Sequence, residues 1–212
     1  MASAFNVGLT GGVGSGKSMI ASMFSNRGAA LVDADVVAHQ LTSVGGAAIA
    51  ALRDSFGAEA IAADGSLDRT YMRARIFSDA ELRIKLERLL HPMIRNAMNE
   101  LADRHVVEGA AYVMRVVPLL VESGNWRVYA DRLLLVDCSG ATQLARVRSR
   151  PGIDDVMAER IIAAQATRAE RLAVAHDVLF NEAPLDHIDQ RVARLHQKYV
   201  QCAAIKRTRE TL

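Results

Sequence analysis

Near its N-terminus the chain reads Gly11-Gly12-Val13-Gly14-Ser15-Gly16-Lys17-Ser18, which matches the pattern G-x-x-x-x-G-K-S of phosphate-binding loops (P-loops). An apolar stretch of strand type, residues 5–9, precedes the pattern, and residues 19–24 follow it with apolar side chains at helical spacing. A strand, a glycine-rich loop and a helix in this order are the context in which the pattern binds phosphate. The stretch therefore predicts an α/β domain that binds a nucleotide.

The residue types of this loop suit a polyphosphate. Glycines at positions 12, 14 and 16 permit backbone angles that let successive N–H groups converge on phosphate oxygens. Lys17 adds a positive charge for the β- and γ-phosphates, and the Ser18 hydroxyl is placed to bind Mg²⁺. The predicted ATP-binding residues are Gly12, Val13, Gly14, Ser15, Gly16, Lys17, Ser18 and Met19.

Two carboxylates follow the second predicted strand, residues 29–33. Asp33 and Asp35 come where the carboxyl end of a parallel strand faces the ligand crevice. Aspartate is also common at turns and helix N-termini, so a structural role remains an alternative for both. The positions favour a functional role for both.

The next convincing strand, residues 111–117, begins about 75 residues later, although a crossover needs only about a dozen residues. The sequence between predicts a helical insert at 36–108 on a core of 5–35 and 109–205. We expect helices at 46–56 and 68–77. A third helix opens with a capping-box pattern at 78–81 and ends or kinks at Pro92, and a fourth follows through residues 94–101.

The second half of the chain alternates between strand and helix patterns. Strands are predicted at 132–137 and 178–181, and helices at 141–150 and 185–205. Asp154 or Asp155 caps a long helix that is expected to continue through Leu172. The alternation therefore predicts an α/β fold with a five-stranded parallel sheet, flanking helices and a helical insert.

Three arginines cluster at the end of the 141–150 helix, just before Pro151-Gly152. Such a run usually marks a solvated helix face. If the P-loop serves an enzyme that transfers phosphoryl groups, however, the place of the run before a chain break favours a mobile lid, about residues 140–156, that closes positive charge over the phosphates. Arg146 and Arg150 are the predicted catalytic pair, and Arg148 is expected to be a bystander.

Composition narrows the class of protein. The chain has 212 residues, half of them hydrophobic, and a net charge of +2, which does not favour general nucleic-acid binding. Cys138 and Cys202 lack metal-ligand spacing and indicate a reducing compartment. Neither a signal peptide nor a membrane span is visible, so we expect a cytoplasmic protein that is a monomer or weak oligomer.

The complete set of motifs resembles the dephospho-CoA kinase family. The resemblance spans residues 5 to about 200 and depends on the P-loop, Val32-Asp33-Ala34-Asp35, Leu90-His91-Pro92, Val117-Pro118-Leu119-Leu120-Val121-Glu122 and Ala164-Gln165-Ala166-Thr167-Arg168. It implies a P-loop kinase fold whose helical insert binds the substrate and which carries a small lid. It also implies that ATP, with Mg²⁺, phosphorylates the ribose 3′-hydroxyl of dephospho-CoA, the last step of coenzyme A synthesis.

The resemblance also implies roles for individual residues. Asp35 is the candidate base, with Lys17 and the lid arginines stabilising the transferred phosphoryl group, and Asp33 helps to hold the metal with Ser18. The implied substrate-binding residues are Asp33, Asp35, His91, Arg95, Leu119, Leu120 and Glu122.

Some positions depart from the family pattern. Met19 stands where a threonine is usual, and Pro151 replaces a common acid. His176 and the Asn181-Glu182-Ala183 run replace the usual Ala-Asp and Asn-x-Gly, which puts carried-over adenine contacts at these positions in doubt.

Other functions are also compatible with a P-loop. Another small-molecule kinase, such as a nucleotide kinase, uses the same chemistry. A GTPase-type switch is disfavoured because no Asn-Lys-x-Asp motif occurs, and a nucleic-acid ATPase is disfavoured by the low net charge.

Overall fold

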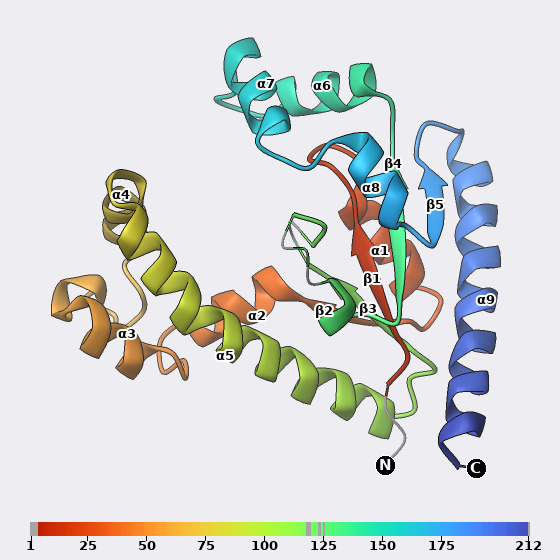
Figure 1. Ribbon diagram of the computed structural model, residues 1–212, viewed down its shortest axis with the longest axis horizontal. Coiled ribbons are helices and arrows are strands. Elements are labelled where there is room, and N and C mark those ends of the chain that lie inside the picture. The colour runs from red at the N-terminus through yellow and green to blue at the C-terminus, as the bar shows by residue number, and fades with distance from the viewer. Residues whose placement is uncertain (1–3, 118–119, 123, 125, 212) are drawn as a thin grey trace. The chain divides into compact units, whose positions relative to one another are not determined.

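The computed structural model describes residues 4–117, 120–122, 124 and 126–211 (Figure 1). It divides into two compact units. The first comprises residues 1–32 and 102–212, and the second comprises residues 33–101. The predicted insert, 36–108, overlaps the second unit, and its role as a substrate-binding part stays a prediction.

A five-stranded sheet forms the centre of the first unit and has the order β2-β3-β1-β4-β5. The strands are β1 (Asn6–Thr10), β2 (Ala30–Asp33), β3 (Val113–Val116), β4 (Arg132–Asp137) and β5 (Asp177–Phe180). β1 pairs in parallel with β3 and β4, and β4 pairs in parallel with β5, which confirms the predicted parallel sheet. The P-loop therefore begins at the carboxyl end of the central strand, where ligands bind in such sheets.

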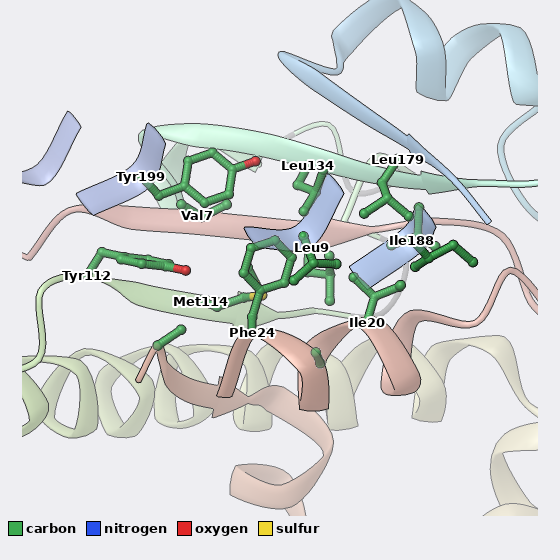
Figure 2. Close-up of a cluster of buried hydrophobic side chains, with 14 of the residues drawn as sticks. Val7, Leu9, Ile20, Phe24, Tyr112, Met114, Leu134, Leu179, Ile188 and Tyr199 are labelled. Carbon is green, nitrogen blue, oxygen red and sulfur yellow. The ribbon is translucent and has the colours of Figure 1, made fainter. Parts of the chain in front are cut away.

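One face of the sheet is covered by α1 (Lys17–Ser25) and α9 (Leu185–Thr211), as Figure 2 shows. Phe24 of α1 and Tyr199 of α9 are fully buried, with stacked ring centroids 6.0 Å apart. They pack against buried strand residues that include Val7, Met114 and Leu134. Burial of this apolar surface holds α1 against the sheet and so fixes the start of the helix behind the P-loop.

A smaller apolar cluster contains Leu120, Trp126 and Leu133. A Cβ atom at Gly8 of β1 would lie 3.0–3.1 Å from side-chain atoms of Leu120, Ala130 and Leu133. Glycine therefore lets this cluster pack directly on the central strand.

Three short helices follow β4, namely α6 (Gly140–Arg148), α7 (Asp155–Ala163) and α8 (Arg168–Val174). The predicted single helix from Asp154 or Asp155 through Leu172 was therefore wrong, although Asp154 does cap α7. Thr167 and Glu170 form a capping box that starts α8 as a separate helix. The break leaves residues 164–167 as a short connection, which contacts the P-loop.

The second unit contains α2 (Ala34–Leu41), α3 (Ile49–Phe56), the 3₁₀ helix η1 (Ala58–Ala60), α4 (Arg69–Ser78) and most of α5 (Ala80–Val107). The sequence did not predict α2, which begins directly after β2. The predicted capping box at 78–81 was also wrong, because the Asp79 carboxylate, not Ser78, accepts the N–H groups of Glu81 and Leu82.

The two helices expected on either side of Pro92 are one continuous helix, α5. Proline removes one backbone hydrogen bond and its ring crowds the carbonyl four residues earlier, here that of Arg88, an exposed residue. Apolar residues continue at helical spacing on both sides of Pro92, which favours a single helix. Across the described residues, no helix is long and apolar enough to cross a membrane.

Candidate active site

The P-loop connects β1 to α1 and has a conformation that requires glycine. Gly16 precedes α1 with φ 91°, a left-handed backbone angle that other residues rarely adopt. A Cβ atom at Gly16 would collide with the side-chain amide of Asn181, and one at Gly12 would collide with that of Gln143. The glycines therefore serve both the turn of the loop and its close approach to neighbouring amides.

The side chain of Lys17 folds back onto the backbone of the loop. Its ammonium Nζ donates to the carbonyl oxygens of Gly11 at 2.6 Å and Gly12 at 3.2 Å. These contacts hold the charge at the loop, in a position from which it can turn to a phosphate.

The first turn of α1 contains no acidic residue, so its positive dipole end is not neutralised by its own side chains. Ser18 and Met19 are both exposed at this helix start. An exposed hydroxyl one residue after the loop lysine suits the coordination of a hydrated cation that arrives with a nucleotide.

Two buried polar atoms beside the loop lack a hydrogen-bond partner in the described structure, Ser15 Oγ and Gln143 Nε2. Ser15 is 2% exposed and Gln143 8% exposed. Buried polar atoms are normally paired, because an unmet hydrogen bond costs about 1–3 kcal/mol. This pair of unmet groups indicates that the loop is built to receive a polar ligand.

Asn181, directly after β5, is a site residue that the sequence did not assign. Its buried amide Nδ2 donates to the Ser15 carbonyl at 2.7 Å. Arg146 donates to the Asn181 carbonyl at 3.1 Å and to the carbonyls of Gly14 and Ser15 at 3.3 and 3.4 Å. The only sequence signal for Asn181 was a polar residue at the end of a strand.

This geometry places Arg146 against the backbone of the P-loop, and its predicted catalytic role stays a prediction. Arg148 forms ion pairs with Asp155 at 2.9 Å and Glu159 at 3.9 Å, which join α6 to α7. Arg150 is exposed after the end of α6.

The connection between α7 and α8 also contacts the loop. Gln165 accepts the Val13 N–H at 2.8 Å, and the neighbouring Ala166 N–H donates to Glu122 at 2.9 Å. Arg171, which is 6% exposed, donates to the Ala166 carbonyl and lies 4.0 Å from Glu122. Glu122 thus holds this connection in place, and its role in substrate binding stays a prediction.

Other predicted substrate residues are distributed over both units. Leu120 is fully buried in the cluster with Trp126 and Leu133, whereas Leu119 lies outside the described residues. His91 and Arg95 are exposed on α5. A pocket within the second unit is lined instead by Ser55, Phe56, Tyr71, Met72, Arg75 and Leu82.

Asp33 and Asp35 lie at the start of α2. The Asp33 carboxylate accepts the Asp35 N–H at 2.8 Å and the Val36 N–H at 3.4 Å, and so caps the helix. Asp35 is exposed in the first turn. Asp33 therefore has the structural role that was the alternative, as the cap of α2, while its proposed role at the metal stays a prediction.

Comparison with known proteins identifies the family. A family model described as Dephospho-CoA kinase matches residues 5–187. The chain belongs to the dephospho-CoA kinase family. The curated Dephospho-CoA kinase of Burkholderia pseudomallei (strain K96243) is 49% identical over 204 residues, covering 96% of this chain and 99% of that protein.

Solved structures support the same fold for this member of the dephospho-CoA kinase family. The crystal structure of TT1252 from Thermus thermophilus is 28% identical, with a TM-score of 0.78, and covers 92% of this chain and 98% of that one. Dephospho-CoA kinase from Campylobacter jejuni is 18% identical, with a TM-score of 0.62 and coverage of 92% and 96%.

His176 and Glu182, two residues that depart from the dephospho-CoA kinase pattern, both make specific contacts in the structure. His176 Nδ1 accepts the Leu133 N–H at 3.1 Å, and its ring packs edge-on against Trp126. Glu182 accepts both the backbone N–H and the hydroxyl of Ser139, and these hydrogen bonds lower the pKa of Glu182. His176 thus packs against the smaller apolar cluster, and Glu182 fixes the start of α6.

Proposed function

We propose that this chain transfers the γ-phosphoryl group of ATP to the ribose 3′-hydroxyl of dephospho-CoA, forming coenzyme A. The observation that carries the proposal is a P-loop with unmet buried polar groups in a chain whose dephospho-CoA kinase match spans residues 5–187. The family makes the chain a kinase and makes ATP and dephospho-CoA its small-molecule substrates.

The P-loop binds the ATP phosphates in this proposal. Its backbone N–H groups and the start of α1 offer hydrogen bonds and positive potential to the anion. Lys17 exchanges the carbonyls of Gly11 and Gly12 for phosphate oxygens, and its charge stabilises the transferring group.

The proposed Mg²⁺ ligand is Ser18, whose exposed hydroxyl fits a cation that also binds the phosphates. Within the described residues, no group of three or more His, Cys, Asp or Glu side chains is arranged to hold a metal. A cation bound mainly by ATP suits this arrangement, with Asp33 proposed to orient one of its water ligands. The cation would supply charge neutralisation at the phosphates.

Asp35 is the proposed base that accepts the proton of the acceptor hydroxyl. Its place in the first turn of α2 leaves the carboxylate exposed, as a base that meets a substrate must be. His91, Arg95, Leu119, Leu120 and Glu122 remain the proposed acceptor-binding residues, and Arg150 the proposed lid residue that meets the phosphates.

An acceptor competition tests the proposal. The purified protein, with ATP and Mg²⁺, is offered dephospho-CoA, AMP, CMP and shikimate together, and the products are measured by mass spectrometry. We expect dephospho-CoA alone to gain one phosphate, at the 3′-hydroxyl. Phosphorylation of AMP without phosphorylation of dephospho-CoA would instead support a nucleotide kinase. We also propose a monomer or weak oligomer that does not bind nucleic acid, which size-exclusion chromatography with and without DNA checks.

A further inference from the structure

The Gln165 side chain offers the P-loop more than a structural contact. Its amide oxygen accepts the Val13 N–H at 2.8 Å, although the two residues are 152 positions apart. A backbone N–H can donate only to the oxygen of a side-chain amide, so this contact fixes which way the amide faces. The amide nitrogen Nε2 therefore also lies beside the loop.

Among the described residues, no acceptor pairs with that nitrogen. The segment that carries it is held firmly, because Glu122 binds the Ala166 N–H and Arg171 binds the Ala166 carbonyl. Arg168 adds a further anchor through a two-atom contact with Asp137, with its shortest distance 2.6 Å. The amide group is thus presented to the loop by a fixed segment, with both N–H groups of its NH₂ unused.

A second observation points to a ligand at the same loop. The buried atoms Ser15 Oγ and Gln143 Nε2 lack hydrogen-bond partners in the described structure; Ser15 is in the P-loop and Gln143 lies against Gly12. With Gln165 Nε2, they offer three hydrogen-bonding groups around one loop. Phosphate oxygens are strong acceptors for donors of this kind.

We propose that Gln165 is a phosphate-binding residue, held by Val13 through its carbonyl and donating through its NH₂ group to a phosphate of bound ATP. This deepens the proposed function, since it assumes ATP as the ligand but not dephospho-CoA as the acceptor. The connection between α7 and α8 thereby becomes part of the nucleotide site.

Two substitutions of Gln165 distinguish the contribution of its side-chain carbonyl from that of its NH₂ group. Gln165→Met removes the acceptor and the donor at similar length, whereas Gln165→Glu keeps an acceptor for Val13 but replaces the donor by a negative oxygen. Titration calorimetry with ATP and Mg²⁺, without acceptor, measures the dissociation constant. We expect a rise of about threefold to tenfold for methionine. For glutamate we expect a rise of about thirtyfold or more at low salt, because the charge repels the phosphates.

Gln190→Met and Gln190→Glu, at an exposed position of α9, are the matched controls and should leave ATP affinity within twofold of the parent. Hydrogen exchange at the Val13 amide should accelerate in Gln165→Met and stay slow in Gln165→Glu. The additional loss of ATP affinity in Gln165→Glu should become smaller at high salt. If Gln165→Glu binds ATP no more weakly than Gln165→Met, Gln165 is not a phosphate donor. Failure to make coenzyme A with normal ATP binding would overturn only the acceptor assignment.

Discussion

The amide nitrogen of Asn181 donates to the carbonyl oxygen of Ser15 at 2.7 Å, joining positions 166 residues apart in the chain. Both residues are 2% exposed. Because Asn181 directly follows β5 and Ser15 is in the P-loop, this bond ties the loop to the far end of the sheet. Arg146 strengthens the same tie by donating to the Asn181 carbonyl.

Asn181→Asp should destabilise the fold and weaken ATP binding. The substitution places a carboxylate oxygen against the Ser15 carbonyl in a buried site, where a lost donor costs about 1–3 kcal/mol. Denaturant unfolding should show a loss of that size, and calorimetry a weaker ATP complex. Asn26→Asp, at the exposed end of α1, is the control and should change the free energy of unfolding by less than about 0.5 kcal/mol.

Asp35→Asn should lower turnover by roughly 10²–10⁴-fold, the usual contribution of a general base, with ATP affinity little changed. Asparagine keeps the shape of the side chain but cannot accept the proton. Asp33→Asn should retain the cap of α2, since asparagine caps helices as well as aspartate does. Steady-state kinetics over a range of Mg²⁺ concentrations should rescue part of the Asp33→Asn loss and none of the Asp35→Asn loss. Turnover of Asp35→Asn within about threefold of the parent would leave Asp35 without a base role.

Arg150→Ala should reduce turnover more than it weakens dephospho-CoA binding, because a lid residue contributes most in the transition state. Arg148→Ala is the matched control on the same helix end. Its ion pairs with Asp155 and Glu159 are largely exposed, and such pairs contribute about 0–1 kcal/mol. Separate measurements of binding and turnover decide the matter, and equal losses in both for Arg150→Ala would indicate an ordinary ground-state contact.

Stability should fall as the pH drops from about 7 to about 5, partly through His176. Burial, and then the nearby Arg132 charge, lower the pKa of His176, and its Nδ1 must be unprotonated to accept the Leu133 N–H. The unfolded chain therefore takes up the proton more readily, so stability is complete above the unfolded pKa of about 6.5 and is lost as pH falls below it.

Denaturant unfolding at pH 7.5 and 5.0 measures this dependence. His176→Gln, which cannot titrate, should show a smaller loss of stability over the interval than the parent. The interval lies above the carboxylate range, where Asp177 and Glu182, whose pKa values are lowered, contribute a separate loss. An unchanged pH dependence in His176→Gln would mean that His176 does not titrate in this range.

Local patterns predicted much of this protein. The P-loop, the strand at residues 132–137 and the start of the terminal helix at Leu185 lie where the sequence placed them. These features depend on residue periodicity, glycine placement and short-range spacing, which are properties of neighbouring residues. The same motifs were specific enough to indicate the kinase family, and the family match confirms it.

Competing local signals were harder to rank. Pro92 indicated a helix end, yet α5 continues through it, with apolar residues at helical spacing on both sides. The cost of the proline is therefore outweighed by other contributions to the helix. Conversely, apolar spacing indicated one long helix beyond Asp155, yet the Thr167–Glu170 capping box starts a new one. In both cases the outcome depends on whether the free energy that favours continuing the helix exceeds the free energy that favours ending it, and a sequence pattern does not measure either.

The partners of the P-loop were decided only by the tertiary structure. Asn181, Gln165 and Arg146 reach the loop from β5, from the α7–α8 connection and from α6, across more than 130 residues of sequence. No periodicity connects such positions, because each contact depends on how parallel strands are ordered and how helices pack on them. The phosphate-binding loop can therefore be predicted from the sequence. The side chains that contact it can be identified only once the helices are packed on the sheet.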